Sequence, residues 1–363
     1  MRAPSGVANR ARRQVNPVHV VLPGDVDDPA RPSGGNVYDR RVCLGLPAAG
    51  RTVREHTVPG GWPRPGSAAR RELARVLAGI PAEATVLLDG LVACGVPDVV
   101  TPHAPRLRLA VLVHLPLGDE TGLAPSLAAD LNTREGFTLR AAATVVATSP
   151  WTARRIRTLH GLAAHVVVPG VDPAPAALAD AAGTRLLCVG SVTPTKGQDL
   201  LVEALARVAD RDWTCRLVGP LTRDPAHVAA VRALVDRHGL ADRVALAGPC
   251  TGADLDAAYA QADLLVLPSR RVAFGMVVTE ALARGIPVLA VAVDGVPETL
   301  ADAAVADLLV DPAADPAEAL AGALRRWLDD ADLRRTARAR ARRERPNLPS
   351  WEATARCLAR VLP

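Results

Sequence analysis

Aromatic residues are scarce in this chain of 363 residues, where Phe, Trp and Tyr together make up 2% of the sequence. The hydrophobic fraction is nevertheless 49%, so the cores must be built from Ala, Val and Leu. This composition suits α/β layers, because the buried strands of a parallel sheet read as aliphatic runs. The length allows two domains of ordinary size.

Sequence motifs that are missing exclude several further classes. No apolar run approaches the length of a membrane span. No GxGxxG follows the first strand candidate, so a nicotinamide or flavin fingerprint is missing, and in TPTKG (193–197) the lysine precedes the glycine, which rules out a P-loop. The six cysteines lack CxxC spacing and mostly fall in apolar runs, which predicts buried free thiols in a reducing compartment.

The balance of charge does not demand a nucleic-acid partner. A net charge of +5 permits an anionic partner without requiring one, and we expect no nucleic acid because no aromatic platform accompanies the basic residues. Residues 1–16 are basic but carry no apolar stretch of the kind found in a secretion signal, so we expect a disordered basic tail. The expected location is therefore cytoplasmic.

Aliphatic segments alternate with helical ones along the chain, which favours parallel sheets with right-handed crossovers. The strand candidates are 18–23, 85–90, 107–117, 144–149 and 165–170 in the first half, and 185–191, 214–220, 243–249, 263–269, 287–293 and 307–310 in the second. The expected helices are 67–80, 151–160, 197–208, 226–239, 254–262 and 276–284.

The segment 171–183, rich in Ala, Pro and Asp, separates the two halves and is interpreted as a linker. The sequence thus predicts an N-terminal domain over 17–170 and a C-terminal domain over 184–345. Two doubly wound, Rossmann-like α/β domains joined in this way face a central cleft at the carboxyl ends of their strands, where ligands bind.

Two unusual features follow strands of the first half. Gly34 and Gly35 open a helix, and the pair is either a tight turn or a set of backbone amides that face a phosphate or a sugar. His114 stands at the end of LAVLVHLPL. A lone histidine is commonly only a part of the hydrogen-bonded structure, but its place at the carboxyl edge of a sheet makes it a candidate site residue.

The second half places a lysine and a carboxylate at comparable positions. Lys196 lies at the start of a helix, where its charge opposes the helix dipole unless an anionic ligand is present. Gly275 precedes another helix, and Glu280 lies one turn into it. Together these residues predict a nucleotide diphosphate, with the carboxylate on vicinal hydroxyls such as those of a ribose.

The second half resembles the retaining glycosyltransferases of the GT-B fold, family 4. The matching pieces are VGSVTPTKGQDLLVEALA, LAGPCTGADLDAAYAQADLLVLPS, FGMVVTEALARGIPVLA and DGVPETL. In the first half, SGGNVYDRRVCLGL resembles the family's glycine loop and helix, VHLPL its strand-end histidine, and VVPGVD its exit to the linker. SWEATARCLARVL resembles the C-terminal helix that crosses back onto the first domain, which implies such a helix within 346–363.

The resemblance implies a role for each candidate residue. Lys196 would bind the donor's diphosphate, Glu280 its ribose hydroxyls, and His114 would touch the transferred sugar; these three are the catalytic candidates. Gly34 and Gly35 would lie against the donor phosphates from the other domain. The residues that would present backbone amides to phosphate and sugar are Phe274, Gly275, Met276 and Val277.

Two positions depart from the family's pattern. The family usually has a glutamate eight residues before the ribose glutamate, where this chain has Val272. It also usually has an arginine where Ser191 stands, although serine occurs in some members. One sugar-facing carboxylate and one phosphate-facing cation are therefore missing from the donor site. The departures indicate either an unusual donor sugar or weak catalysis.

The resemblance also implies a mechanism and leaves alternatives open. The acceptor would attack on the face from which the diphosphate leaves, a departing phosphate oxygen would take its proton, and no metal or other cofactor is expected. The acceptor is a small molecule, a glycan or a lipid. The alternatives are a catalytically weakened nucleotide-sugar-binding protein or partner subunit of the same fold, and a nucleotide-sugar epimerase.

The arginine-rich segment LRRTARARARRERP (333–346) is basic nearly all round if it forms a helix. We interpret it as a solvated face. The alternative is peripheral contact with an anionic membrane surface, where each basic residue adds ~1 kcal/mol, and a lipid acceptor would account for such contact.

Overall fold

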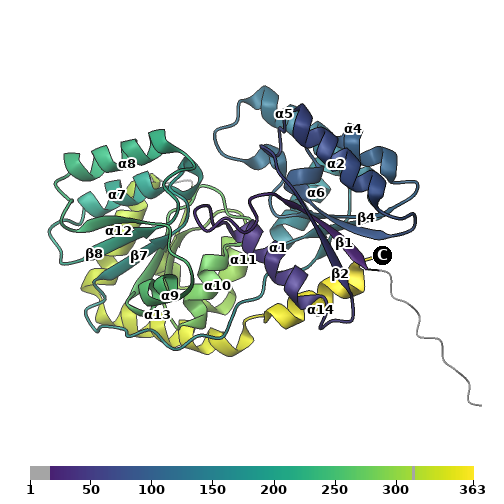
Figure 1. The fold of residues 1–363 in the computed structure, drawn as a ribbon. Helices are drawn as coiled ribbons and strands as arrows, with labels where there is room; N and C mark the ends of the chain where they lie inside the picture. Colours follow the sequence, from purple (N-terminus) through teal and green to yellow (C-terminus); the bar gives the residue numbers. More distant parts are fainter. Residues whose placement is uncertain (1–16, 313–314) are drawn as a thin grey trace, which may run out of the picture.

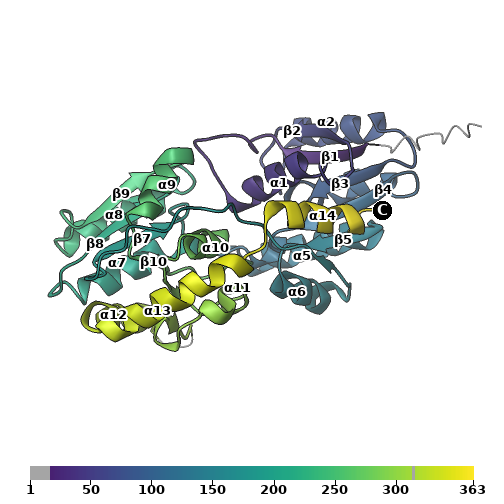
Figure 2. The ribbon, with the colours of Figure 1, turned by 90° about the horizontal axis from the view of Figure 1, so that it is seen from below.

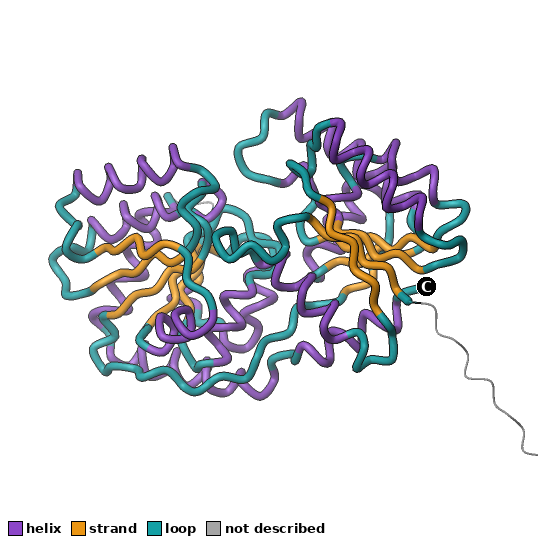
Figure 3. The backbone as a smooth tube through the Cα atoms, viewed as in Figure 1, coloured by secondary structure: helices purple, strands orange, loops and turns teal. Residues whose placement is uncertain are grey.

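The computed structural model describes residues 17–312 and 315–363, so the tail expected at residues 1–16 lies outside the described residues. Two parallel sheets of six strands each, with helices on both faces, form two α/β domains (Figures 1 and 3). The predicted class, two doubly wound α/β domains, is confirmed.

The first domain contains a sheet of strand order β2-β1-β3-β4-β5-β6. Its strands are β1 (Val18–Pro23), β2 (Val53–Val58), β3 (Thr85–Asp89), β4 (Arg108–Val113), β5 (Thr144–Ala147) and β6 (His165–Val166). Its helices are α1 (Gly34–Gly45), α2 (Ser67–Gly79), α3 (Gly90–Ala93), α4 (Pro97–Val100), α5 (Pro125–Ala141) and α6 (Pro150–His160).

The second domain contains a sheet of strand order β12-β11-β10-β7-β8-β9. Its strands are β7 (Arg185–Val189), β8 (Thr214–Val218), β9 (Val244–Gly248), β10 (Leu264–Leu267), β11 (Val288–Val291) and β12 (Leu309–Val310). Its helices are α7 (Gln198–Ala206), α8 (Pro225–Arg237), α9 (Gly252–Ala260), α10 (Met276–Ala283), α11 (Val296–Leu300), α12 (Pro316–Asp329) and α13 (Ala331–Glu344), and α14 (Trp351–Val361) ends the chain.

Short 3-10 helices join several of these elements. They are η1 (Thr101–His103), η2 (Leu117–Asp119), η3 (Pro194–Lys196), η4 (Ala301–Ala303), η5 (Ala306–Leu308) and η6 (Arg345–Asn347).

Aliphatic residues fill the cores on both faces of each sheet. On β3, Val86 and Leu88 pack into one cluster of the first domain, whereas Leu87 packs into the cluster on the opposite face. The second domain adds the two largest fully buried side chains, Trp213 and Trp327. Because both faces are covered, the strands read as aliphatic runs in the sequence, which is why they were detectable.

Both sheets reverse their strand order near the middle. In the first sheet β1 lies between β2 and β3, and in the second β7 lies between β8 and β10. The connections that leave β1 and β3, and those that leave β7 and β10, therefore diverge to opposite sides. Ligands of open α/β sheets bind at the carboxyl ends of strands next to such a reversal.

The last helix of the chain lies against the first domain. The segment α12–α13–α14 runs from the second domain to the first (Figure 2). Thr354 of α14 donates its hydroxyl to the Val168 carbonyl at 2.9 Å, and the Trp351 ring meets the Tyr38 ring edge-on at 6.0 Å. Because α14 packs on the first domain, both ends of the described chain lie in that domain.

The interpretation of residues 333–346 as a solvated face is wrong for part of the segment. Arg334 is 9% exposed and donates to the carbonyls of Ala181, Trp327 and Leu328. Arg345 donates to two further backbone carbonyls. These arginines satisfy carbonyl groups of neighbouring segments, a role that a helical projection of charge does not reveal.

Two further expectations can be compared with the described residues. None of the helices in the described ranges combines the length and the apolar composition that crossing a membrane requires. All six cysteines are free, and four of them are buried, as predicted. Burial raises the pKa of the Cys43 and Cys188 thiols to about 12, which keeps both in the unreactive thiol form.

Candidate functional site

The connection after β7 carries Ser191 and Lys196. Ser191 is half-buried and its carbonyl accepts from the Gln198 side chain at 3.1 Å. Lys196 ends η3, and its aliphatic stem lies against Gly190, where an added Cβ would be 3.4 Å from the Lys196 Cδ. Burial lowers the pKa of Lys196, although the Glu120 charge opposes this. Within residues 17–312 and 315–363 the ammonium group has no hydrogen-bond or salt-bridge partner.

Lys196 is also unusual in the composition of the chain, which the motif alone does not show. It is the only lysine in a chain whose Lys and Arg residues number 43. Arginine therefore serves at every other basic position. A compact ammonium group is retained only at this strand end, which favours a chemical role for it over a general preference for basic residues.

The connection after β10 leads through Phe274 and Gly275 into α10. Gly275 adopts φ +88°, a left-handed conformation that suits glycine, and no side chain in the described ranges caps the helix. The first turn of α10 carries no acidic residue, so the backbone N–H groups of Met276 and Val277 remain available. An anion placed there would accept from these groups and would be favoured by the helix dipole.

These two connections, on either side of the strand reversal, are held together. The Arg270 N–H donates to the Thr195 carbonyl at 2.8 Å, and the Arg270 guanidinium binds both carboxylate oxygens of Asp199 at 2.9 and 2.6 Å. A Cβ on Gly197 would lie 2.1 Å from the Pro268 carbonyl, so only glycine fits there. The lysine loop and the start of α10 are thus fixed relative to one another.

Glycines of the first domain reach the same place. Gly34 and Gly35 open α1, as the sequence predicts. A Cβ on Gly34 would lie 3.5 Å from the Sδ atom of Met276 in the other domain, and one on Gly35 would lie 3.4 Å from the His114 ring. The structure therefore brings the start of α1, the start of α10 and His114 together at the interface of the two domains.

His114 is held by two buried carboxylates. Its Nε2 atom lies 3.0 Å from Asp39 Oδ1 and 3.9 Å from Asp89 Oδ2, and its side chain is 24% exposed. Burial lowers the pKa of His114, but the charges of Asp39 and Asp89 outweigh this effect, so the pKa lies above its ordinary value. Burial, reinforced by Asp39, raises the pKa of Asp89 well above its ordinary range. Asp39 is thus the direct partner of the imidazole, and proton binding is favoured at both His114 and Asp89.

The same three residues form a cluster that the sequence spacing did not reveal. One ligand atom from each of Asp39, Asp89 and His114 lies within 4.8 Å of the other two, close enough in principle to hold a metal ion. In this arrangement the Asp39–His114 hydrogen bond already occupies one oxygen and the ring nitrogen. Asp39 could have been noticed, because it lies four residues after Gly35 and hence on the same face of α1.

Glu280 has a structural partner that the sequence did not disclose. The Tyr259 hydroxyl donates to Glu280 Oε2 at 2.7 Å, and the Arg284 guanidinium lies 4.7 Å from the Tyr259 ring centroid. Burial raises the pKa of Glu280, although the bond from Tyr259 and the charge of Arg284 oppose this. The hydrogen bond orients the carboxylate and leaves its Oε1 atom for a ligand.

Val272, the departure beside the donor site, is 5% exposed and packs in an apolar cluster of the second domain. Its N–H donates to Asp294 Oδ2 at 2.9 Å. The valine therefore offers no polar side-chain atom to a ligand. The Asp294 carboxylate, from the loop after β11, lies next to the Val272 backbone.

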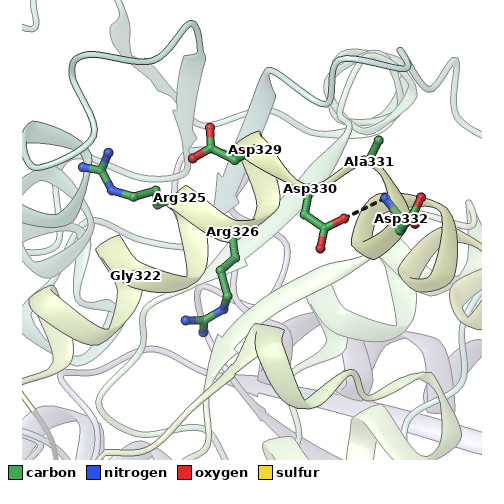
Figure 4. A pocket seen from close by; sticks show the side chains of 7 residues that line it. All are labelled: Gly322, Arg325, Arg326, Asp329, Asp330, Ala331 and Asp332. Carbon is green, nitrogen blue, oxygen red and sulfur yellow. Dashed lines mark hydrogen bonds between the residues drawn. The ribbon is translucent and has the colours of Figure 1, made fainter.

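A shallow depression of about 690 Å³ lies elsewhere, between the end of α12 and the start of α13 (Figure 4). Asp330 lies along it and accepts from the Asp332 N–H at 2.8 Å as the cap of α13. Arg325 and Asp329 pair with residues near α7. No connection that leaves the carboxyl end of a strand lines this depression, so it offers none of the features of the interface site.

Comparison with known families agrees with the geometry of the second domain. Residues 177–344 match the family described as glycosyl transferases group 1. The group 1 domain thus contains Ser191, Lys196 and the whole connection from Val272 to Glu280.

Curated relatives of this group 1 domain carry one recurrent name. A D-inositol 3-phosphate glycosyltransferase of Salinispora arenicola is 38% identical over 183 residues, which cover 48% of this chain and 39% of that protein. D-inositol 3-phosphate glycosyltransferase 1 of Catenulispora acidiphila is 32% identical over 289 residues, which cover 73% of this chain and 66% of that protein. A third or more of each relative lies outside the match.

Solved structures show the fold of the whole chain. Sucrose-phosphate synthase from Thermosynechococcus elongatus superimposes with a TM-score of 0.76 at 23% identity and covers 94% of this chain and 98% of its own. Anabaena HepE in complex with UDP and glucose gives a TM-score of 0.73 at 19% identity, with the same coverage. The fold is GT-B, as the resemblance implied.

Proposed function

We propose that the protein is a retaining glycosyltransferase of family 4 that moves a sugar from a nucleotide-diphosphate donor to an acceptor. The observation that carries the proposal is the convergence of the Lys196 loop with the starts of α1 and α10, where a Cβ added to Gly34 would lie 3.5 Å from the Sδ atom of Met276. Two helix N-termini and one unpaired ammonium group suit a diphosphate. The group 1 match over 177–344 and the relatives' names support the same activity.

Each predicted residue then has a chemical task. Lys196 and the N–H groups at Gly275–Met276 neutralise the leaving diphosphate, and the Glu280 carboxylate accepts from ribose hydroxyls. Gly34 and Gly35 allow the α1 backbone to approach the phosphates. His114, which Asp39 orients through the hydrogen bond at its Nε2 atom, contacts the transferred sugar. The second cation that is missing at Ser191 has a candidate in Arg223, whose charge acts on Lys196 and whose guanidinium donates to the Arg31 carbonyl.

The proposed reaction needs no protein nucleophile. The bond between the anomeric carbon and the diphosphate breaks while the acceptor oxygen bonds to that carbon on the same face. The proton of the acceptor hydroxyl passes to the departing phosphate oxygen. The protein positions the reactants and stabilises the charge of the leaving group, and Lys196 with the helix N-termini replaces a metal ion in this role.

The acceptor is proposed to be a small molecule, because both relatives are named D-inositol 3-phosphate glycosyltransferase. The glycan and lipid alternatives remain open to the same assay. Peripheral contact of the arginine-rich segment with an anionic membrane, and a cytoplasmic location, stay predictions. Because several arginines of the segment 333–346 bind backbone carbonyls, fewer of them are left for such contact.

The experiment is a nucleotide-release assay on the purified protein with UDP-, GDP- and ADP-sugars, in the presence and absence of a chelator. We expect turnover with at least one donor, unaffected by the chelator, and a loss of about 10²–10³-fold in Lys196→Met, which keeps the length but not the charge. No release from any donor would reject the proposed activity. Nucleotide binding without release would instead favour the weakened binding protein, and a changed sugar on the intact donor would favour an epimerase.

A further inference from the structure

Asp294 adopts a backbone conformation that is uncommon for residues other than glycine, although aspartate tolerates it better than most. It has φ +49°, in the left-handed region, where glycine is the usual residue. It follows β11 at the carboxyl edge of the second sheet and precedes Gly295, the N-cap of α11. Strained residues of this kind persist at functional sites when the surrounding structure fixes them, so the reason for an aspartate here can be sought in its contacts.

Hydrogen bonds join the turn that contains Asp294 to the connection that leads into α10. Asp294 Oδ2 accepts from the Val272 N–H at 2.9 Å, and the Gly295 N–H donates to the Val272 carbonyl at 3.0 Å. The Thr299 hydroxyl donates to the Phe274 carbonyl at 2.6 Å. These bonds hold the Asp294 carboxylate beside the loop that opens the candidate phosphate site.

The same carboxylate faces the first domain. Arg271 Nε lies 3.0 Å from Asp294 Oδ2, and the Arg271 guanidinium also pairs with Asp119 of the first domain at 3.4 Å. Arg155 binds both oxygens of Asp119 at 2.7 Å. The Asp294 side chain is 12% exposed, and in the described ranges its second oxygen, Oδ1, accepts no hydrogen bond. One oxygen is thus used for positioning and the other is free at the domain interface.

Within the described residues, the structural contacts of Asp294 use only its Oδ2 atom and leave the role of Oδ1 unexplained. Glycine would adopt the turn without strain, and the interface already has an ion pair from α11, between Glu298 and Arg154. Burial raises the pKa of Asp294, as expected for a carboxylate that lacks some of the donors it could use. The neighbouring Val272 side chain is apolar and buried, so it provides no hydrogen-bond acceptor for a sugar hydroxyl.

We propose that Asp294 is a specificity-determining residue whose free carboxylate oxygen accepts hydrogen bonds from hydroxyl groups of the transferred sugar. The inference rests on the proposed function and adds to it the class of donor that Asp294 selects. That class is a sugar with hydroxyl groups rather than a deoxygenated one. The Val272 N–H holds the carboxylate in place, and the bond from the Gly295 N–H to the Val272 carbonyl fixes the turn. Arg271 links this position to the approach of the first domain.

The test compares Asp294→Gly with the wild type. Glycine relieves the strained φ but removes the acceptor of the Val272 N–H, so a melting curve first verifies that the variant folds. Two quantities are measured for the best hydroxylated donor of the wild type: kcat/KM for nucleotide release, and the Tm shift caused by the matching free nucleoside diphosphate. We expect kcat/KM to fall about 10-fold or more while the Tm shift is retained, because the loss is confined to the sugar.

Two controls separate sugar recognition from the other roles of the turn. Glu298→Gln removes an ion pair of the same helix with the first domain and should leave donor preference unchanged. With deoxy-sugar donors that lack the contacted hydroxyl, wild type and Asp294→Gly should differ less than twofold. Equal kcat/KM for both proteins on all donors, or loss of the nucleoside diphosphate shift along with turnover, would overturn the inference. Absence of any turnover by the wild type would reject the proposed function itself, and the inference with it.

Discussion

At the scale of single residues, the site relies on charged groups that the fold has partly removed from water. Lys196, Glu280 and His114 all have shifted pKa values, and in each case burial is one of the causes. Burial strengthens their interaction with a charged ligand because the local dielectric is low. Lys196 and Glu280 therefore cost stability in the empty protein and are expected to recover that cost when the ligand binds, whereas the net effect of the surroundings on charged His114 is favourable.

Glu280→Gln should impair donor use without impairing folding. The glutamine can still accept from the Tyr259 hydroxyl, but it no longer offers a charged acceptor to a ribose. Since burial raises the pKa of Glu280, the ionised form is disfavoured in the folded state, and the neutral variant should keep or slightly raise the Tm at neutral pH. We expect kcat/KM to fall about 10–100-fold, measured by nucleotide release.

Tyr259→Phe is the matched control for this prediction. It removes the 2.7 Å hydrogen bond but keeps the carboxylate, so its effect on kcat/KM should be smaller than that of Glu280→Gln. An unchanged kcat/KM in Glu280→Gln would remove this residue from the donor site.

His114 should stabilise the protein in a pH-dependent manner. Its folded-state pKa lies above the ordinary 6.5, so its contribution is fully present below that value and is lost as the pH rises through the higher folded-state pKa. The Tm difference between wild type and His114→Gln should therefore be largest below the ordinary pKa of 6.5 and should shrink as the pH rises above it. His165→Gln, at an exposed strand residue, serves as the control for replacing a histidine by glutamine. A Tm difference that grows with pH would contradict the assignment of Asp39 as the partner.

At the scale of elements, the buried strands were the most predictable part of the fold. β1 has the predicted bounds, 18–23, and the other buried strands fall inside their predicted ranges because each is an aliphatic run. β2 was missed: it is an edge strand whose residues Arg54, Glu55 and Thr57 are exposed, so it has no aliphatic run to detect. The long α5 also went unnamed, with a weakly amphipathic sequence that gives little periodic signal.

The site was predictable only where a motif carried it. Lys196, Gly275 and Glu280 lie on strand-to-helix connections whose pattern is local in the sequence. Asp89, by contrast, acts through contacts between residues far apart in the chain, and Asp294 gives no local sign of the strained turn that holds it. Such pairings depend on which strand ends become neighbours, and only the strand order supplies that information.

The helix α13 provides a test of the role of its arginines. Arg334→Ala should lower the free energy of unfolding by about 2–4 kcal/mol, because it leaves the buried Trp327 carbonyl and the part-buried Ala181 and Leu328 carbonyls without this donor. Arg335→Ala, one residue on, should change it by less than about 0.5 kcal/mol, because Arg335 is exposed and pairs with Asp332, which is exposed as well. Urea unfolding measures both. Equal effects would restore the interpretation of α13 as a uniformly solvated face.

At the scale of the whole molecule, a few polar contacts join the two domains across the site. Thr195 donates to Glu120 at 2.7 Å, and Arg154 pairs with Glu298. Exposed pairs of this kind contribute about 0–1 kcal/mol each, so they hold the domains near one another without locking them. A ligand bound between the starts of α1 and α10 would contact both domains, and its binding energy is available to close the interface over the reaction and exclude water.

The central claim, that Lys196 binds a nucleoside diphosphate, can be measured directly because the chain has a single lysine. Reductive ¹³C-methylation places an NMR label on this side chain, and its chemical shift reports the pKa of the amine as the pH is varied. In the free protein the pKa should lie below the ordinary 10.5, because burial disfavours the charged form. Saturation with UDP, GDP or ADP should raise the pKa with at least one of them, because the diphosphate stabilises the ammonium form. A Lys196 pKa that none of the three changes would contradict the account.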